Sequence, residues 1–378
     1  MTCSLMKKIL AVVAGGIVFL ALSGSAVASE QKETQNAKKV ILDTDMVEMF
    51  DDGVAMLMLM ENPKIDLLGV VTVTGNTWAN DGMAYLVRQL KAINKLDSAP
   101  TLAIGSQYPN RKAGGFSKEI LKKELATYGD VMAGYIGAAE TENPKSWQDA
   151  YKNTYKEEAP KVDVRTDGVD YLIEMVHKYP HEVTIAAIGP TTNIAEAIKK
   201  DPEFVKLVDE IVYMGGAFWV KGNADEAAEF NIWLDPESTK IAFKAPFDNT
   251  TIVALDVTDK TIMTRDRYLK IRESIKNKAL LELFDKAFFA QQFAKNENKN
   301  FSWFVWDIIV SAVIIDPSLI TSTRYAYIDC LTENNAEYGK TVPYIKDNAP
   351  TGTQPASIIQ EIDQNRFWPM LYGLLEKL

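Results

Sequence analysis

Four aspartates lie close together in one short stretch of the chain, VILDTDMVEMFDDGVAMLMLM, at positions 40–60. They are Asp43, Asp45, Asp51 and Asp52, with no Lys or Arg among them. Carboxylates packed this closely repel one another unless a cation or shared protons neutralise them. Because oxygen ligands without imidazole or thiolate favour hard cations, the stretch predicts a calcium or magnesium site. The alternative is structural: Asp51 or Asp52 caps the helix that follows, and the other aspartates are solvated.

The remaining composition excludes several other kinds of site. The chain has only two histidines, His177 and His181, so it lacks the ligands of a His-rich zinc site and the base of a Ser-His hydrolase. Both flank a Tyr-Pro pair at a predicted helix end, and we expect them on the surface. Of its two cysteines, Cys3 falls in an apolar leader, which leaves Cys330 without a partner for an internal disulfide.

The first residues predict export. Lys7 and Lys8 precede an apolar run at positions 9–22, and the small-residue site AVA follows at 26–28. This pattern is typical of a signal peptide at 1–28, cut before Ser29, with a periplasmic or secreted mature chain at 29–378 and no membrane contact after cleavage. An uncleaved membrane anchor is the alternative, although the run is short for a span. Cleavage takes the formal charge from −10 to −12, and an acidic exported chain is a poor candidate for nucleic-acid binding.

Strand-like and helix-like segments alternate through the rest of the chain. KKVILDTD reads as a buried strand, DDGVAMLMLMENP as a helix capped by aspartate, and IDLLGVVTVTGN as the next strand and its loop. The same alternation returns in HEVTIAAIGPTTNIAEAI and the strand before MGG. The pattern predicts the α/β class, with an open, mostly parallel sheet flanked by helices. The polar segment 111–167 is interpreted as an insertion over one end of the sheet, either a solvated face or a lid or subunit contact.

Ligands bind at the carboxyl ends of strands in such sheets, and several polar motifs follow strands here. They are DTD and DD, GN after VTVT, GPTTN, MGG, and EFN, in that order. With this set the chain resembles the nucleoside hydrolase family (inosine-uridine preferring and relatives) from about Lys39 to Leu319. The resemblance implies a Rossmann-like core, hydrolysis of the N-glycosidic bond of ribonucleosides to ribose and free base, a bound Ca²⁺ ion, and a homodimer or homotetramer.

The resemblance also implies a role for each matching residue. Asp45, Asp52, the backbone carbonyl of Thr192 and Asp307 resemble the calcium ligands, and Asp51 resembles the general base that takes a proton from a calcium-bound water. Asp43 would lie behind the ligands. The residues that resemble the substrate pocket are Asn76, Met214, Asn223, Glu229 and Asn231. Asn193, beside Thr192, is predicted to be a turn or helix-cap residue.

Several residues depart from the family pattern. The loop DTDMVEMFDD is two residues longer than the common form, with Val47 and Glu48 where related loops have Gly and Asn. We expect Glu48 either to face the pocket or to point to solvent. Asp259 replaces a histidine that often follows DVT. Trp306 precedes Asp307 where pyrimidine-accepting members often have histidine, and it resembles the tryptophan of purine-specific members.

Because a tryptophan can stack on the larger purine face, the predicted activity is purine-preferring, calcium-dependent ribonucleoside hydrolysis. Trp303, three residues before Trp306, is predicted to share a helical face with it. Two other functions remain open. The chain could be an exported nucleoside- or ribose-binding protein that retains the calcium pocket without turnover, or a hydrolase of another N-ribosyl compound.

Overall fold

The computed structural model describes residues 37–49, 51–112, 115–295 and 301–378. The predicted signal peptide, residues 1–28, lies outside the described residues. Of the helices that the structure describes, none combines the length and apolarity that a bilayer crossing requires.

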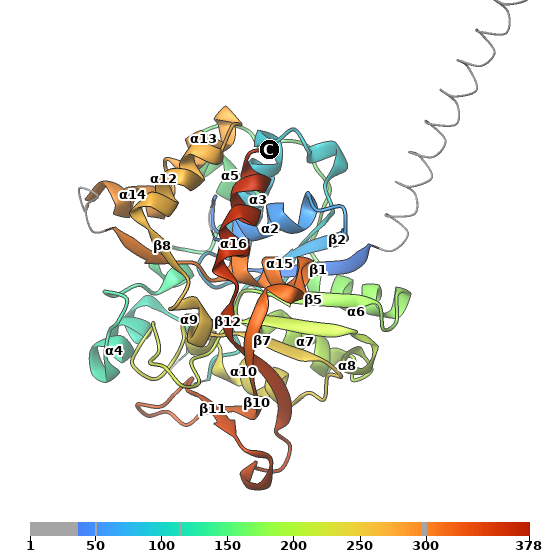
Figure 1. Cartoon of the computed structure of the whole chain (residues 1–378), viewed down its shortest axis with the longest axis vertical. Coiled ribbons are helices and arrows are strands. Elements are labelled where there is room, and N and C mark those ends of the chain that lie inside the picture. Colours follow the sequence, from blue (N-terminus) through green and yellow to red (C-terminus); the bar gives the residue numbers. More distant parts are fainter. Residues whose placement is uncertain (1–36, 50, 113–114, 296–300) are drawn as a thin grey trace, which may run out of the picture.

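A large mixed sheet forms the centre of the described chain (Figure 1). Ten strands join in the order β11-β10-β12-β7-β6-β5-β1-β2-β3-β4, and every neighbouring pair from β12 to β4 is parallel. Only β10 pairs antiparallel, with β11 and with β12. The predicted open, mostly parallel α/β sheet is confirmed. The strands are β1 (Lys38–Thr44), β2 (Ile65–Thr72), β3 (Thr101–Ile104), β4 (Val164–Arg165), β5 (Val183–Ala187), β6 (Glu210–Met214), β7 (Thr250–Val253), β10 (Ile320–Cys330), β11 (Thr341–Tyr344) and β12 (Gln354–Ile362), with β8 (Ile262–Thr264) and β9 (Ser302–Phe304) in a separate antiparallel pair.

The strand order reverses direction between β1 and β5. From β1 the chain proceeds through β2 to β4 on one side, whereas β5, β6 and β7 extend the sheet on the other side. In open α/β sheets such a switch point opens a crevice at the carboxyl ends of the strands. The loop after β1 carries Asp45, and the turn after β5 leads to Thr192. Sheet topology therefore brings two of the predicted motifs to one place.

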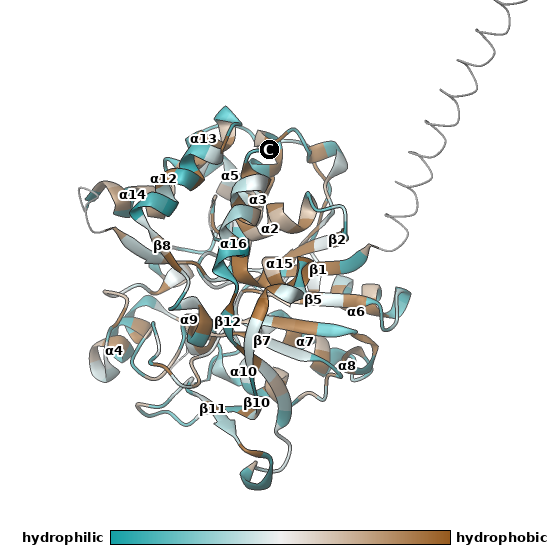
Figure 2. Cartoon of the chain, in the orientation of Figure 1, coloured by the Kyte–Doolittle hydropathy of each residue, from teal (hydrophilic) through white to brown (hydrophobic). Residues whose placement is uncertain are grey.

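Helices cover both faces of the sheet, and alternation along β1 shows how the faces are divided. Val40 and Leu42 belong to one apolar core, and Ile41 belongs to the other. Figure 2 shows hydrophobic colour along the central strands and a mainly hydrophilic α12 at the periphery. The first core packs against α2 (Asp52–Met60), α3 (Ala79–Ala92), α5 (Trp147–Tyr155), α12 (Arg265–Ser274), α13 (Lys278–Phe284), α14 (Phe288–Lys295), α15 (Asp307–Ile315) and α16 (Gln364–Leu375); the second packs against α6 (Gly168–Lys178), α7 (Thr192–Lys200), α8 (Phe204–Leu207) and α10 (Pro236–Lys244). The remaining short elements are α4 (Lys118–Tyr128), α9 (Phe230–Leu234), α11 (Leu255–Thr258), η1 (Leu96–Ser98), η2 (Gly137–Glu140), η3 (Pro317–Leu319) and η4 (Lys346–Asn348).

Two buried and mainly apolar helices, α2 and α15, pack together inside the first core. The Ser311 hydroxyl on α15 donates to the carbonyl of Ala55 on α2 at 2.9 Å. The sequence predicted that an aspartate caps α2, but the side chain of Asp51 makes no cap hydrogen bond there. Asp51 does occupy the predicted N-cap position of α2, but its carboxylate accepts the first backbone N–H groups of α15 instead.

The segment 111–167 packs against the sheet and its helices at several points. Its helix α5 contacts α3, its strand β4 pairs with β3 at the sheet edge, and α4 shares a third apolar cluster with α9. Arg111, at the start of the segment, is buried and ion-paired with Glu124 of α4. These contacts hold the segment close to the carboxyl end of the parallel strands.

Candidate functional site

Two aspartates from the switch-point loop are buried with one oxygen each left unpaired. Asp45 Oδ2 accepts the backbone N–H of Asn76 at 2.6 Å, and Asp52 Oδ1 accepts the Thr44 hydroxyl at 2.6 Å. Asp45 Oδ1 and Asp52 Oδ2 have no hydrogen-bond partner in the described part of the chain. A buried carboxylate oxygen without a partner is costly, and a bound cation would remove that cost.

Burial and the neighbouring carboxylates together raise the pKa of these groups. Burial, followed by the neighbouring Asp52 charge, raises the pKa of Asp45 well above its usual value, and burial also raises the pKa of Asp52. Asp307 begins α15, and its pKa is raised well above normal by burial and then by Asp51, Asp52 and Asp45. The four acids therefore form one electrostatic cluster, although they come from two distant parts of the chain. Such a set of oxygen donors fits a hard divalent cation.

Asp51 is the best hydrogen-bonded of the four. Its Oδ2 accepts the backbone N–H groups of Trp306 at 2.8 Å and Asp307 at 3.2 Å, and its Oδ1 accepts that of Ile308 at 3.2 Å. Burial raises the pKa of Asp51 to about 7, although these backbone donors act in the opposite direction. A carboxylate has about four acceptor positions, so one remains for a further donor.

Thr192, the fourth predicted ligand, is the first residue of α7 and is buried. Its hydroxyl donates to Asp235 Oδ2 at 2.7 Å, and that contact fixes the start of the helix against α10. The predicted cation ligand is the backbone carbonyl of Thr192, and the hydrogen bond made by the hydroxyl does not involve this carbonyl.

The predicted substrate residues gather around α9 and the end of β6. Glu229 caps α9 by accepting the backbone N–H groups of Asn231 and Ile232, and it also accepts that of Gly216 at 3.1 Å. Asn231 Nδ2 donates to the carbonyls of Ile188 and Met214. Burial raises the pKa of Glu229 to about 7. Glu229, Asn231 and Met214 are thus joined in one buried polar unit.

Asn76 and Asn223 are partly exposed, unlike that buried unit. Asn223 Oδ1 accepts the backbone N–H of Phe230 at 2.8 Å, next to Glu229. Asn76 is tied to Asp45 through its backbone, as described above. Both amides therefore keep Nδ2 as a donor, and no hydrogen bond of either Nδ2 occurs among the described residues.

Trp306 lies at the start of α15, directly beside the acidic cluster. Its side chain is partly buried, and its ring centroid lies 6.1 Å from that of Phe304. The indole Nε1 is buried and has no hydrogen-bond partner in the described residues. Trp303 belongs to strand β9, so the prediction that it shares a helical face with Trp306 was wrong. It packs instead against Phe288 and Phe289.

Two residues have structural roles that the sequence did not indicate. Asn193 was predicted to be a turn or cap residue, but its Nδ2 donates to Asp43 Oδ1 at 2.6 Å and its Oδ1 accepts the backbone N–H of Ser106. It therefore holds buried Asp43 from α7, on the opposite side of the sheet from α2. Glu48, of the lengthened loop, is hydrogen-bonded by the hydroxyl of Tyr155 on α5. No local sequence pattern signals either contact.

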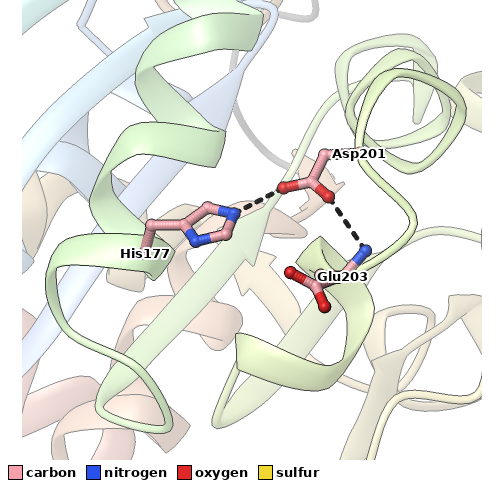
Figure 3. A group of neighbouring side chains, drawn as sticks. All are labelled: His177, Asp201 and Glu203. Atoms are coloured by element: carbon pink, nitrogen blue, oxygen red, sulfur yellow. Dashed lines mark hydrogen bonds and ion pairs between the residues drawn. The ribbon is translucent and has the colours of Figure 1, made fainter.

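A second group of potential ligands lies elsewhere. Ligand atoms of His177, Asp201 and Glu203 come within 4.8 Å of one another, the only such acidic group in the described residues (Figure 3). His177 Nε2 is 2.6 Å from Asp201 Oδ2, and Asp201 Oδ1 accepts the backbone N–H of Glu203. His177 and Glu203 are exposed, so an ion pair at the start of α8 accounts for the group. The predicted aspartates do not converge as tightly, but they are buried, and Asp45 and Asp52 each keep one unpaired oxygen.

Two cavities at the surface lie away from the predicted residues. One, of about 500 Å³, is lined by residues of α6 and α7 that include Asp170 and Lys199. The other, of about 1000 Å³, lies between β3 and the segment around Pro160. Neither is lined by an acid of the cluster.

Comparison with known proteins identifies the family. A family model described as inosine-uridine preferring nucleoside hydrolase matches residues 40–369. The chain belongs to this family. Nucleoside hydrolases are enzymes that cleave the N-glycosidic bond of ribonucleosides, and the match spans every motif on which the resemblance was based.

Relatives and solved structures agree with the assignment. The chain is 29% identical to the inosine-uridine preferring nucleoside hydrolase of Crithidia fasciculata, over 90% of this chain and 98% of that protein. It is 28% identical to a pyrimidine-specific ribonucleoside hydrolase of Escherichia coli, over 90% and 96%. Among solved structures, a plant nucleoside hydrolase has a TM-score of 0.72 at 25% identity, covering 90% of this chain and 99% of that one. A purine-preferring ribonucleoside hydrolase of Gardnerella vaginalis has a TM-score of 0.65 at 27% identity, covering 90% and 100%.

Proposed function

We propose that this nucleoside hydrolase is an exported, calcium-dependent enzyme that prefers purine ribonucleosides. The observation that carries the proposal is the pair of buried, unpartnered oxygens, Asp45 Oδ1 and Asp52 Oδ2, beside Asp307 at the sheet's switch point. In this proposal Asp45, Asp52, Asp307 and the carbonyl of Thr192 hold the cation. When bound, the cation lowers the pKa of a water and orients the vicinal ribose hydroxyls.

The acidic cluster suits the charge that the reaction develops. Cleavage of a ribosyl bond builds positive charge on the anomeric carbon and the ring oxygen. Anionic groups fixed before the reaction stabilise that charge without reorganising during it. Asp51 is assigned as the general base because it keeps one acceptor position and burial raises its pKa above the ordinary value, which makes the carboxylate a stronger base.

The amide and carboxylate groups around α9 are assigned to ribose. Glu229 and Asn231 are rigid because backbone groups hold them, and Asn76 and Asn223 offer free amide donors at the partly exposed side. Met214 supplies an apolar wall next to Asn231. Such prearranged polar groups orient a substrate at little entropic cost.

Trp306 supports the purine preference. Its ring is only partly buried and stands next to Asp307. An indole gives a stacking surface to the leaving base but no titratable acid, so stacking is the means of activation available at this position. The two rings of a purine offer the larger area.

Two further proposals concern the mature protein. The leader at 1–28 supports cleavage before Ser29 and a periplasmic or secreted location. A homodimer or homotetramer is proposed by analogy with the family.

One observation favours a second candidate, a binding protein without turnover. Three backbone donors occupy the carboxylate of Asp51, which reduces its freedom to accept a proton. A third candidate, hydrolysis of another N-ribosyl compound, rests on the contact between Glu48 and Tyr155, which joins the lengthened loop to segment 111–167.

Ribose release by the purified mature chain distinguishes these functions. The substrates are inosine, guanosine, adenosine, uridine and cytidine, each with calcium and with a chelator. Chelator-sensitive release with purines ahead is expected. No release, combined with calcium-dependent binding of ribose or nucleoside by calorimetry, would favour the second candidate.

A further inference from the structure

Residues 135–138 of segment 111–167 contact the turn that carries Asn76, a residue of the predicted ribose site. The backbone N–H of Ala138 donates to the carbonyl of Gly75 at 2.8 Å, and the Tyr135 hydroxyl donates to Asn76 Oδ1 at 3.0 Å. Gly137 has a φ of +57°, and a Cβ there would lie 2.3 Å from the Gly75 carbonyl oxygen. The approach of the two backbones therefore requires glycine, and it places Tyr135 directly over the turn that carries Asn76.

Asn76 connects this contact to the acidic cluster. Its backbone N–H donates to Asp45 Oδ2, the oxygen opposite the unpartnered Oδ1. The chain of contacts thus runs from the Tyr135 hydroxyl through Asn76 to Asp45. It links a residue of segment 111–167 to a proposed cation ligand in two steps.

The position of Tyr135 is itself fixed. Its ring packs on Phe230, with ring centroids 5.2 Å apart, and Phe230 follows Glu229 directly. Burial and the charges of Asp45 and Asp52 raise the pKa of Tyr135, so its hydroxyl remains a protonated donor at neutral pH. In this contact the Tyr135 hydroxyl donates and Asn76 Oδ1 accepts, so Nδ2 is directed elsewhere.

We propose that Tyr135 is a positioning residue for ribose: it locks the Asn76 side chain so that Nδ2 serves as a hydrogen-bond donor to a sugar hydroxyl. This inference rests on the proposed function, because it takes Asn76 as a ribose contact. Without the tyrosine hydroxyl, the amide is free to rotate, and its carboxamide oxygen competes for the position of Nδ2.

The test variant is Tyr135→Phe, which removes the hydroxyl and retains the ring packing on Phe230. We expect KM for inosine and for uridine to rise by the same factor, about fivefold, with kcat nearly unchanged. The Kd of ribose, measured by calorimetry in calcium, should rise by that factor too. The effect should not depend on the base because Asn76 is assigned to the sugar.

A double-mutant cycle separates positioning from a structural role. If Tyr135 acts through Asn76, Tyr135→Phe should change KM and the ribose Kd no further in an Asn76→Ala background. Tyr151→Phe is the matched control: its hydroxyl belongs to the same segment but donates to Glu157 at 2.8 Å, and it should behave as wild type in KM and Kd. Circular dichroism melts check that every variant is folded.

The outcomes are distinct. An active wild type with unchanged KM and ribose Kd in Tyr135→Phe overturns the inference alone, as do losses that add independently in the cycle. A wild type that neither releases ribose from nucleosides nor binds ribose overturns the proposed function and the inference together.

Discussion

The carboxylate of Asp51 receives the backbone N–H of Trp306 at 2.8 Å, across 255 positions of sequence. One contact therefore joins the proposed general base to the backbone of the proposed base-stacking residue, at the start of α15. A change at Asp51 should act on the chemistry and on the fold at once.

The first prediction separates these two effects with Asp51→Asn. The amide retains an acceptor for the α15 amides but cannot take a proton, so kcat should fall by about 10² to 10⁴ and the free energy of unfolding by about 1 kcal/mol. Ribose Kd should change little. Asp363→Ala, at the cap of α16, should cost about 1 kcal/mol of stability without changing kcat. Turnover equal to wild type in Asp51→Asn would exclude Asp51 as the base.

The sequence predicted the elements around this contact but not the contact itself. Apolar periodicity and strand alternation are local, so the β1, α2 and β2 segments and the parallel sheet were evident from the residues alone. The cap of α15 depends on where tertiary packing places α2 against it, and no local rule carries that information. The same holds for the hydrogen bond between Asn193 and Asp43, because it depends on the order of the strands in the sheet.

The location of the site at the switch point was predictable because polar motifs after parallel strands converge there. The number of hydrogen bonds that each carboxylate already accepts from the protein could not be predicted. Glu229 has three backbone donors, whereas Asp45 and Asp52 each keep an unpaired oxygen. These differences arise from loop conformation, and the resemblance to a family does not specify them.

The second prediction concerns calcium. Since a cation would pair the free oxygens and screen the acids, calcium at a hundredfold above its Kd should stabilise the fold by about 3 kcal/mol, seen as a rise in Tm. Asp52→Asn should abolish this rise, while lowering repulsion in the chelated protein. Asp201→Asn, in the exposed His177 group, should retain it. If instead Asp201→Asn removed the shift and Asp52→Asn did not, the cation would bind at the surface group.

The third prediction concerns base preference. Loss of stacking in Trp306→Ala should lower kcat/KM for inosine about tenfold and for uridine much less, because the purine has more ring area to lose. Ribose Kd should be unchanged. Trp368→Ala, in the core contact with Phe367, should reduce stability while preserving the inosine to uridine ratio. Equal losses for both nucleosides would remove the basis for purine preference.

The fourth prediction uses the pH dependence of stability. The pKa of Glu229 is about 7 in the folded chain, raised by burial from an ordinary value of 4.5, so the folded state binds more protons between these pH values. The free energy of unfolding should therefore be highest below pH 4.5 with respect to this group and should fall by at most about 3 kcal/mol as pH rises to 7.

Urea unfolding of the chelated protein across this range measures the slope. Glu229→Gln cannot titrate, so it should lose this part of the slope and keep the part contributed by other buried acids. Glu203→Gln changes an exposed side chain and should keep the wild-type slope. Identical slopes in all three proteins would show that Glu229 does not titrate in this window.

The last prediction tests how segment 111–167 is held in place. The Arg111 side chain is buried, ion-paired with Glu124, and stacked on the rings of Trp233 and Tyr338, while Glu124 also accepts the Trp233 indole N–H at 2.6 Å.

Glu124→Ala leaves a buried guanidinium without its carboxylate and should cost about 3 to 5 kcal/mol of the free energy of unfolding, measured with urea. Glu158→Ala, which removes an exposed ion pair with Lys152 in the same segment, should cost under about 1 kcal/mol. Because Tyr135 belongs to the segment that this pair anchors, Glu124→Ala should also raise the ribose Kd. A stable variant with wild-type binding would mean that the segment is held without Glu124.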